Sequence, residues 1–336
     1  MKVDVHDRLT AVGPAAWDDL LARARLHSPF LSWTWQSEWA AVFAPDRRLD
    51  VRRVEDADGQ LAAILPLHEA APGTWRLLGG VDISDYLDLI AVEGMEMEAW
   101  LALLGSRSAD PAIWELHAVP GASPTVSALP GLAATAGLTA TVTLEERCPV
   151  LALPGSWEAY LAGLPGKHRH ELTRKLRRFE REAPDARVTC LRRPEEIRTR
   201  IGDFLDLHRR SRAGKARFMD ARMETFFRQI ASALAGRHAV ALWFLDLPAG
   251  PAAAFFCLEW NGTVGLYNSG FHPDLASLAP GLVLLSRLIQ DAIARGKRTF
   301  DFLRGEERYK HEFGPVPEEV YAVTIGPSPA GATAPR

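Results

Sequence analysis

The chain has 336 residues, of which 47% are hydrophobic and 24% charged, with a net charge of −3. This globular composition provides for two sizeable cores. It excludes a membrane protein built on apolar spans, and the start MKVDVHDRLT lacks an apolar signal core, so we expect a soluble, cytoplasmic protein. The three cysteines are far apart with no CxxC pair, so we expect neither a disulfide framework nor a metal site.

The first half of the chain alternates helical and strand patterns. Alternating residues around the turn DADG at 56–59 predict a β-hairpin of 51–54 with 61–68. We expect the other elements as helices at 17–27, 35–43, 95–104 and 123–136 and strands at 75–78, 86–92 and 113–119.

The second half begins after a Pro-rich patch, near Cys148. A basic amphipathic helix over 167–182 is followed by a strand, two helices and three strands joined by tight turns. We expect these at 188–191, 194–211, 222–235, 239–247, 252–260 and 263–270, then a helix to about 296 and a strand over 298–304. The two hairpins resemble each other in pattern, so two α/β domains of similar build are predicted.

Charge is unevenly distributed along the chain. Residues 167–228 hold 19 Lys and Arg against 10 Asp and Glu, a net +9. An anionic ligand near this segment is one interpretation, but a solvated basic helix face over 167–182 is preferred because no aromatic residues are interleaved for base stacking.

Common catalytic signatures are missing from the sequence. It has no GxSxG, Walker A, strand-linked GxGxxG or HExxH motif. Two histidines in the C-terminal region, His272 and His311, are candidate bases, although a hydrogen-bonded loop histidine is the commoner outcome.

The stretch YNSGFHPDLASLAPGLVLL, residues 267–285, leads into a helix without a capping side chain or an acid in its first turn. The N–H groups of Gly281, Leu282 and Val283 are therefore free to hold phosphate oxygens, or else are hydrated. The last strand of the meander ends before this helix, with Tyr267, Asn268, Ser269, Gly270 and His272. They are expected either to reach a bound donor or to serve only as turn residues.

Three segments together resemble one family. "YNSGFHPDLASLAPGLVLLSRLIQDAIARGKRTFDFLRGEERYKHEFG", "FLSWTWQSEWAAVF" and "SDYLDLIAV" are similar to BioF2-like, CelD/BcsL-type acetyltransferases of the GNAT superfamily, relatives of the FemABX peptidyltransferases. "KHRHELTRKLRRFERE" resembles their basic helix, so the resemblance covers about residues 28–314.

The resemblance implies an α/β (α+β) fold of two tandem GNAT-like domains, each a mixed, mostly antiparallel sheet flanked by helices. Residues 1–147 would form the degenerate, acceptor-side domain, 148–325 the acyl-donor domain and 326–336 a disordered tail. Acyl-CoA or acetyl-CoA is the implied donor, and the acceptor is a small molecule or a cell-envelope precursor with an amine or hydroxyl. The usual phosphate loop, Q/R-x-x-G-x-G/A, is altered here: 277–282 read SLAPGL, without a basic or amide side chain. FemABX relatives share this feature and use aminoacyl-tRNA.

Residues near the C-terminus carry the predicted chemistry. Asp301 lies in the apolar strand TFDFLRG and is the expected general base, or else a structural acid paired with Arg304. Lys310 matches a family position that contacts the acceptor or the developing charge, and Tyr309 would protonate the leaving group by analogy. Arg304 is a candidate carboxylate or phosphate clamp, or an ion-pair partner of a neighbouring acid.

The segment ISDYLDLIAV supplies the predicted acceptor contacts. Asp85, Tyr86 and Asp88 stand beside apolar residues, which is typical either of a cleft or of an edge strand with a polar face. Three functions therefore stay open: acyl transfer from a CoA-type thioester, FemABX-like transfer from aminoacyl-tRNA, and a non-catalytic GNAT-like module in a polysaccharide or cell-envelope pathway. The sequence does not indicate the oligomeric state.

Overall fold

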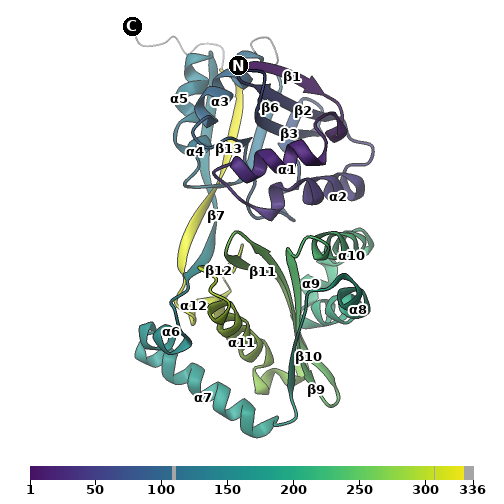
Figure 1. Cartoon of the computed structure of the whole chain (residues 1–336), viewed down its shortest axis with the longest axis vertical. Helices are drawn as coiled ribbons and strands as arrows, with labels where there is room; N and C mark the ends of the chain where they lie inside the picture. The colour runs from purple at the N-terminus through teal and green to yellow at the C-terminus, as the bar shows by residue number, and fades with distance from the viewer. Residues whose placement is uncertain (108–110, 306, 329–336) are drawn as a thin grey trace. The chain divides into compact units, whose positions relative to one another are not determined.

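The computed structural model describes residues 1–107, 111–305 and 307–328 (Figure 1). The chain divides into two compact units. Unit 1 contains Met1–Glu146 and the segment from Glu318 onward, and unit 2 contains Arg147–Pro317. The second unit thus ends before the expected limit at 325, because the last strand pairs within unit 1.

The sheet of unit 1 has the strand order β1-β2-β3-β4-β6-β13-β7, with β5 paired to β3. Neighbouring pairs from β1 to β4 are antiparallel, and β4 with β6 is parallel. The strands are β1 (Lys2–His6), β2 (Leu49–Glu55), β3 (Leu61–Ala71), β4 (Thr74–Leu77), β5 (Ile90–Ala91), β6 (Ile113–Pro120), β7 (Leu138–Ala152) and β13 (Val316–Pro327).

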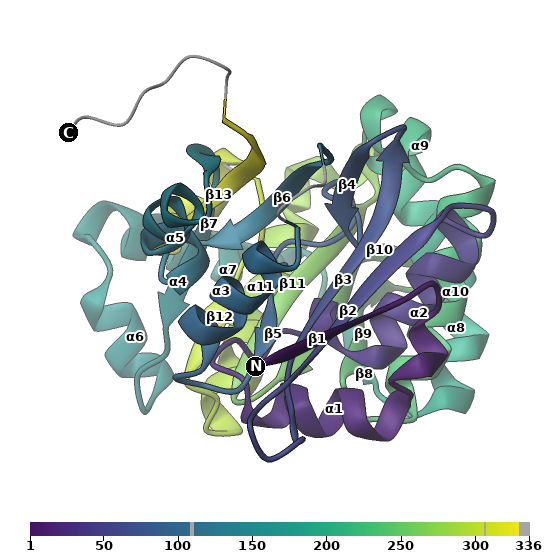
Figure 2. The ribbon, with the colours of Figure 1, turned by 90° about the horizontal axis from the view of Figure 1, so that it is seen from above.

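The helices of unit 1 form two groups, α1 with α2 and α3 with α4 and α5 (Figure 2). Their bounds are α1 (Pro14–Arg23), α2 (Trp33–Phe43), α3 (Glu96–Gly105), α4 (Pro124–Ser127) and α5 (Leu129–Thr135), with 3-10 turns η1 (Leu9–Ala11) and η2 (Pro29–Leu31). The tryptophans of "FLSWTWQSEWAAVF" serve mainly the core, since Trp35 is fully buried and Trp39 is 4% exposed.

The sheet of unit 2 continues from the last residues of β7 in the order β12-β11-β10-β9-β8. Its strands are β8 (Arg187–Leu191), β9 (Val240–Leu247), β10 (Gly250–Trp260), β11 (Thr263–Phe271) and β12 (Thr299–Asp301). Its helices are α6 (Trp157–Gly163), α7 (Gly166–Glu182), α8 (Pro194–Ser211), α9 (Ala213–Phe218), α10 (Ala221–Ala235), α11 (Pro280–Ala294) and α12 (Arg308–His311), with the 3-10 turn η3 (Pro273–Leu278). Helix α11 packs on β9, β10 and β11, while α8 packs on β10 and β11.

Strands β11 and β12 are paired in parallel only from Thr263 to Gly265. Strand β11 continues to Phe271, whereas β12 ends at Asp301. The register of β10 with β11 also shifts between Phe256 and Cys257, which marks an irregularity in the pairing beyond the end of β12. The pairing of the two strands therefore ends before residues 266–271 of β11, which lie directly before η3 and α11 in the chain.

Several elements differ from the sequence prediction. The expected strand over 86–92 is reduced to Ile90–Ala91, and the expected helix over 123–136 is divided before Pro130. Strands β1, β7 and β13 and helix α9 were not predicted. The expected disordered tail begins within β13 at 326–327, and its residues from 329 lie outside the described residues.

Candidate active site

The site begins at the N-terminus of α11. Ala279, the residue before the helix, has left-handed backbone angles, and Pro280 occupies the first helical position without an N–H group. Gly281 and Leu282 follow, and their first-turn N–H groups lie where an α-helix offers no acceptor of its own. Val283 differs from the prediction, because its N–H donates to the Ala279 carbonyl at 3.1 Å. The predicted anion-binding donors are thus reduced to Gly281 and Leu282.

A cavity of about 280 Å³ lies against this helix end. Five segments of unit 2 converge on it: the start of α9, the middle of β10, the end of β11, the stretch from η3 into α11, and α12 with the residue before it. Its walls are formed by Arg212, Lys215, Phe255, Ser269, Gly270, Phe271, Ala276, Ala279, Pro280, Gly281, Leu282, Glu307 and Tyr309. The cavity therefore combines an apolar floor with a helix N-terminus, two cations, a carboxylate and a phenol.

Ser269 links two of these side chains. The Nζ of Lys215 donates to the Ser269 carbonyl and lies 3.2 Å from its Oγ. Tyr309 is hydrogen-bonded to the same serine side chain. Burial raises the pKa of Tyr309, so this phenol is protonated at neutral pH. Burial lowers the pKa of Lys215 to about 8, with Glu307 opposing that change and Arg212 and Lys310 adding to it.

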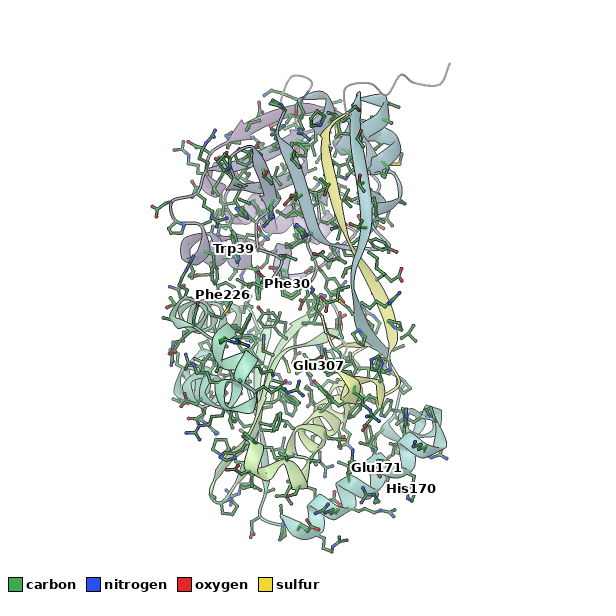
Figure 3. The ribbon with its side chains drawn as sticks, turned by 180° about the vertical axis from the view of Figure 1, so that it is seen from behind. Phe30, Trp39, His170, Glu171, Phe226 and Glu307 are labelled. Atoms are coloured by element: carbon green, nitrogen blue, oxygen red, sulfur yellow. The ribbon has the colours of Figure 1, made fainter. Side chains whose placement is uncertain are left out.

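Glu307 is the carboxylate of the cavity (Figure 3). Burial raises its pKa, but the charge of Lys310 and the hydrogen bond from it outweigh burial, so the net pKa is lowered. The Lys310 Nζ lies 2.8 Å from Glu307 Oε2. Glu307 is consequently ionised at neutral pH, with 38% of its side chain exposed, and is available to accept a proton from a bound amine.

Lys310 is buried and does not line the cavity, so its position differs from the predicted contact with the acceptor. Its side chain is 4% exposed, and its Nζ donates to the carbonyls of Phe302, Arg304 and Gly305 at 2.9–3.1 Å. With Glu307 as a fourth partner, the ammonium has its hydrogen-bonding capacity filled. Lys310 therefore fastens the segment that carries Glu307 and does not itself line the cavity.

Asp301 also differs from its predicted position in a cleft. It is 4% exposed at the end of β12, and its Oδ1 accepts the N–H of Leu303 at 2.7 Å. This bond spans a turn in which Leu303 has a φ of 55°, a left-handed conformation that bulky residues adopt only when held. Asp301 shapes the exit of β12, and it is not among the residues that line the cavity.

His272 lines a second cavity of unit 2, of about 340 Å³, together with Asp203, Asp206 and Arg210 of α8. Its ring is thus separated from Glu307 and Tyr309, which line the first cavity. Its backbone N–H donates to the Ala252 carbonyl at 2.8 Å and extends the pairing of β10 with β11. The catalytic role predicted for His272 has no support from this placement.

Two of the predicted donor contacts are packing positions. Tyr267 stacks on Phe227 with ring centroids 5.5 Å apart. A Cβ on Gly270 would meet the backbone of His208 and Leu207 at 2.5–2.6 Å, so only glycine permits α8 to pack on this part of β11. His208 is 1% exposed and bonds Asn268 Oδ1 through Nε2 at 2.9 Å. These contacts fix the end of β11 that presents Ser269 to the cavity.

The predicted acceptor residues belong to unit 1. Asp88 is 6% exposed, and its carboxylate accepts the Leu89 N–H and the hydroxyls of Ser123 and Thr125. Burial raises its pKa to about 6, and these bonds oppose the rise. Tyr86 is 7% exposed and packs on Phe30. Asp88 is therefore a structural carboxylate, while acceptor contacts from Asp85 and Tyr86 stay predictions.

The basic helix α7 has an ordinary surface chemistry. Leu172 and Phe179 are buried, whereas Arg174, Lys175 and Arg178 pair with neighbouring glutamates. His170 lies on the exposed face beside Glu171 (Figure 3). These ion pairs agree with the preferred interpretation of a solvated basic face.

Sequence reasoning missed Arg212, Lys215 and Glu307 as site residues. Arg212 and Lys215 lie at the start of a helix that was not predicted, in the run SRAGKARFMD between two long helices. A short, Gly-containing basic run between helices is ordinarily a loop. Glu307 was considered only as an ion-pair partner of Arg304. The one available signal was a charged cluster next to the distinctive YKHEFG segment.

The described part of the chain indicates neither a metal site nor a membrane-spanning helix. Over 1–107, 111–305 and 307–328, no three His, Cys, Asp or Glu side chains gather as a metal site would require. Within the same residues, each helix is too short or too polar to cross a bilayer.

Comparisons with known proteins agree with this geometry. The family described as acetyltransferase (GNAT) domain matches residues 166–311, which include α7 through α12 and every residue of the cavity. A comparison with curated proteins gives no match.

Solved structures share the fold of the whole chain. FemX superposes with a TM-score of 0.65 at 11% identity, over 96% of this chain and 97% of its own. A conserved protein of unknown function from Bacteroides thetaiotaomicron gives 0.63 at 14% identity, over 97% and 100%. L-PGS from Bacillus licheniformis gives 0.59 at 12% identity, over 94% and 93%. Residues 166–311 therefore match an acetyltransferase (GNAT) domain, and the chain as a whole shares the fold of FemX.

Proposed function

We propose that this protein transfers an acyl group from a CoA-type thioester to a primary amine in a sequential complex. The observation that carries the proposal is the cavity, in which an uncapped helix end, a carboxylate and a phenol line one space of about 280 Å³. The acceptor is a small molecule or a cell-envelope precursor, and its amine attacks the donor carbonyl directly.

The donor would lie where β11 leaves β12. Its phosphates would meet the N–H groups of Gly281 and Leu282, where the helix dipole favours negative charge. Arg212 adds positive charge to the same cavity, which offsets the basic or amide side chain that the loop 277–282 lacks. The acyl arm would follow the apolar side chains of Phe255 and Phe271. A backbone N–H of the strand β11 beyond its pairing with β12 would stabilise the oxyanion.

Proton transfer is assigned to the two residues at the cavity wall. Glu307 is the general base in place of Asp301, because it is ionised and faces the cavity. Tyr309 is the general acid that protonates the leaving group, since its raised pKa keeps the phenol protonated. Lys310 holds the segment 302–307 and thereby fixes the direction of the Glu307 carboxylate.

Aminoacyl-tRNA is the second candidate donor. Pro280 removes one N–H from the helix end, and the SLAPGL loop departs from the usual CoA loop. FemX and L-PGS share the fold over more than nine-tenths of the chain. In this version the same cavity would hold the aminoacylated 3′ end of the tRNA, and the acceptor would be a cell-envelope precursor or a lipid.

A donor screen tests the proposal. The full chain is incubated with acetyl-CoA, with longer acyl-CoAs and with charged tRNA, each with a panel of amines, and products are identified by mass spectrometry. Release of free CoA that requires an amine and is abolished in Glu307→Gln supports the CoA version. Transfer from charged tRNA alone selects the second candidate. If no donor is consumed and none raises the melting temperature, both versions are overturned.

A further inference from the structure

Three side chains from three elements meet at Ser269. Lys215 comes from α9, Ser269 from β11 and Tyr309 from α12. All three line the cavity, and the serine hydroxyl is hydrogen-bonded both to Tyr309 and to the Lys215 ammonium, 3.2 Å away. The bonds have one direction: an ammonium only donates, so Ser269 Oγ accepts from Lys215 and has its own hydrogen to donate to the phenol.

This direction matters because a buried phenol is a poor acid. Burial raises the pKa of Tyr309, so a tyrosinate formed by loss of its proton in the cavity would be high in free energy. A thiolate leaving group is far less basic than such a tyrosinate, and the proton transfer would run uphill. The transfer becomes favourable only when the tyrosine receives a replacement proton in the same step.

From this arrangement we infer that Lys215 is the proton source for the leaving group, acting through Ser269 and Tyr309. The inference rests on the proposed acyl transfer and assigns a residue that the sequence did not indicate. As the carbonyl carbon–sulfur bond breaks, its electron pair stays on sulfur, which takes the Tyr309 proton. Tyr309 takes the Ser269 proton, and Ser269 takes one from Lys215, which becomes a neutral amine. Lys215 and Ser269 are positioning residues for Tyr309, which alone touches the donor.

After the transfer, Lys215 can regain a proton from another residue of the cavity. Glu307 receives the proton of the attacking amine and lies within Coulombic range of Lys215. Proton return from Glu307 to Lys215 restores both groups, so the net reaction moves one proton from acceptor to leaving group. The charged groups that act on Lys215 are Glu307 and Lys310 from the segment before and within α12, and Arg212, which directly precedes α9. His208 of α8 is also within range of Lys215, and burial keeps its ring neutral at neutral pH.

The pKa of Lys215 suits this role. Burial lowers it to about 8, near that of a thiol, so proton transfer in either direction is readily reversible. The sign of the pH effect follows: Lys215 must begin protonated, so kcat falls as the pH rises through about 8. The acceptor amine must begin neutral, so activity rises with pH before that limit, and the profile is bell-shaped.

The test compares Lys215→Met, Lys215→Arg, Tyr309→Phe and the wild-type chain, using the donor found in the screen. Arg217→Met on the exposed side of α9 is the matched control. We expect Lys215→Met and Tyr309→Phe each to lose about 10²-fold in kcat, as removal of a general acid does, with little change in donor KM. Lys215→Arg keeps the charge but holds its proton too strongly, so we expect a similar loss. The fall in kcat near pH 8 should disappear in both Lys215 variants.

A donor with a better leaving group separates a proton source from a structural contact. An acyl thiophenol ester releases a thiolate that needs no protonation, so the wild-type chain and the Lys215 variants should differ by less than about threefold with it. Three results would overturn the proton transfer from Lys215 while leaving acyl transfer intact. They are a wild-type kcat in Lys215→Arg, a fall in kcat near pH 8 that persists in the Lys215 variants, and an equal loss of kcat with the thiophenol ester. Absence of transfer in the wild-type chain would overturn this proton transfer together with the proposed function.

Discussion

Each unit holds a carboxylate with a perturbed pKa, and the surroundings of the two carboxylates shift their pKa values in opposite directions. In unit 1, Asp88 accepts three hydrogen bonds and is 6% exposed. In unit 2, Glu307 faces a cavity and is kept ionised by Lys310. The pKa is raised in the first case and lowered in the second. A perturbed pKa alone therefore does not indicate chemistry, and what distinguishes Glu307 is that it lines a cavity.

The largest effect should follow from removing the cavity carboxylate. Glu307→Gln keeps the size and one acceptor oxygen but cannot take a proton. We expect kcat to fall by about 10²–10⁴-fold, the usual contribution of a general base, with a smaller change in KM. Steady-state kinetics measures it, and circular dichroism checks that the segment held by Lys310 is retained.

Glu312→Gln is the matched control for that variant. Glu312 follows α12, is 39% exposed and pairs with Lys175 at 3.5 Å on the surface. Its loss should leave kcat within about twofold, because exposed pairs contribute little. Equal losses in Glu307→Gln and Glu312→Gln would show that the segment, and not its carboxylate, matters.

The corresponding change in unit 1 should affect stability instead. Asp88→Ala leaves the Leu89 N–H and the hydroxyls of Ser123 and Thr125 buried without their acceptor. Unsatisfied buried groups of this kind cost about 2–4 kcal/mol of unfolding free energy. Urea unfolding measures the loss, and kcat per folded molecule should stay at the wild-type value. A large fall in kcat with wild-type stability would instead support the acceptor role first predicted for Asp88.

Each unit also has a buried histidine that resists protonation. Burial lowers the pKa of His68 in unit 1 and of His208 in unit 2 to about 4. The unfolded chain then binds these protons first, so stability falls as the pH decreases from about 6.5 to about 4, by up to about 3 kcal/mol per histidine. Asp88 has the opposite effect on stability. Its pKa is raised to about 6 in the folded chain, so the folded chain takes up this proton first and gains stability as the pH falls below about 6.

Unfolding curves at about pH 7 and about pH 5 check this prediction. With two histidines against one aspartate, we expect the wild-type chain to be less stable at the lower pH. Because Asp88 offsets part of the histidine effect, His68→Gln and His208→Gln should each remove well over half of that difference. A difference that persists unchanged in both variants would assign the acid sensitivity to other groups.

Much of unit 2 was predictable because its elements have strong periodic patterns. The meander β9–β11 and the apolar helix α11 are close to their predicted bounds. The uncapped helix end lines the candidate cavity, and its role in binding an anion stays a prediction. Strand β7 was missed because its alternating threonine and apolar stretch runs into the charged residues EER and then into Pro149, which interrupt the strand pattern. Strand β13 was missed because its pairing with β6 is long-range.

The site was harder to predict than the fold, for a physical reason. Asp301 stands in an apolar strand and was favoured as the base, whereas Glu307 stands in an unpatterned polar run. The left-handed turn at Leu303 and Gly305 redirects the chain, so that the later residues reach the cavity. Periodicity gives no information on such a turn, nor on which of two carboxylates meets Lys215 and Tyr309.

The smallest expected effect concerns the helix end itself. A Cβ at Gly281 would have no heavy atom within 4 Å, and the residue has no positive φ, so a side chain fits there without strain. Gly281→Asp places a carboxylate at the second helical position, which should stabilise α11 by about 0.5–1 kcal/mol. The same charge would repel donor phosphates, and we expect donor KM to rise about tenfold with kcat nearly unchanged. Gly281→Ala controls for loss of the glycine and should leave KM within about twofold. A donor KM that is the same in Gly281→Asp and Gly281→Ala would mean that no anion binds at this helix end, and the donor phosphates would then have to be sought at Arg212.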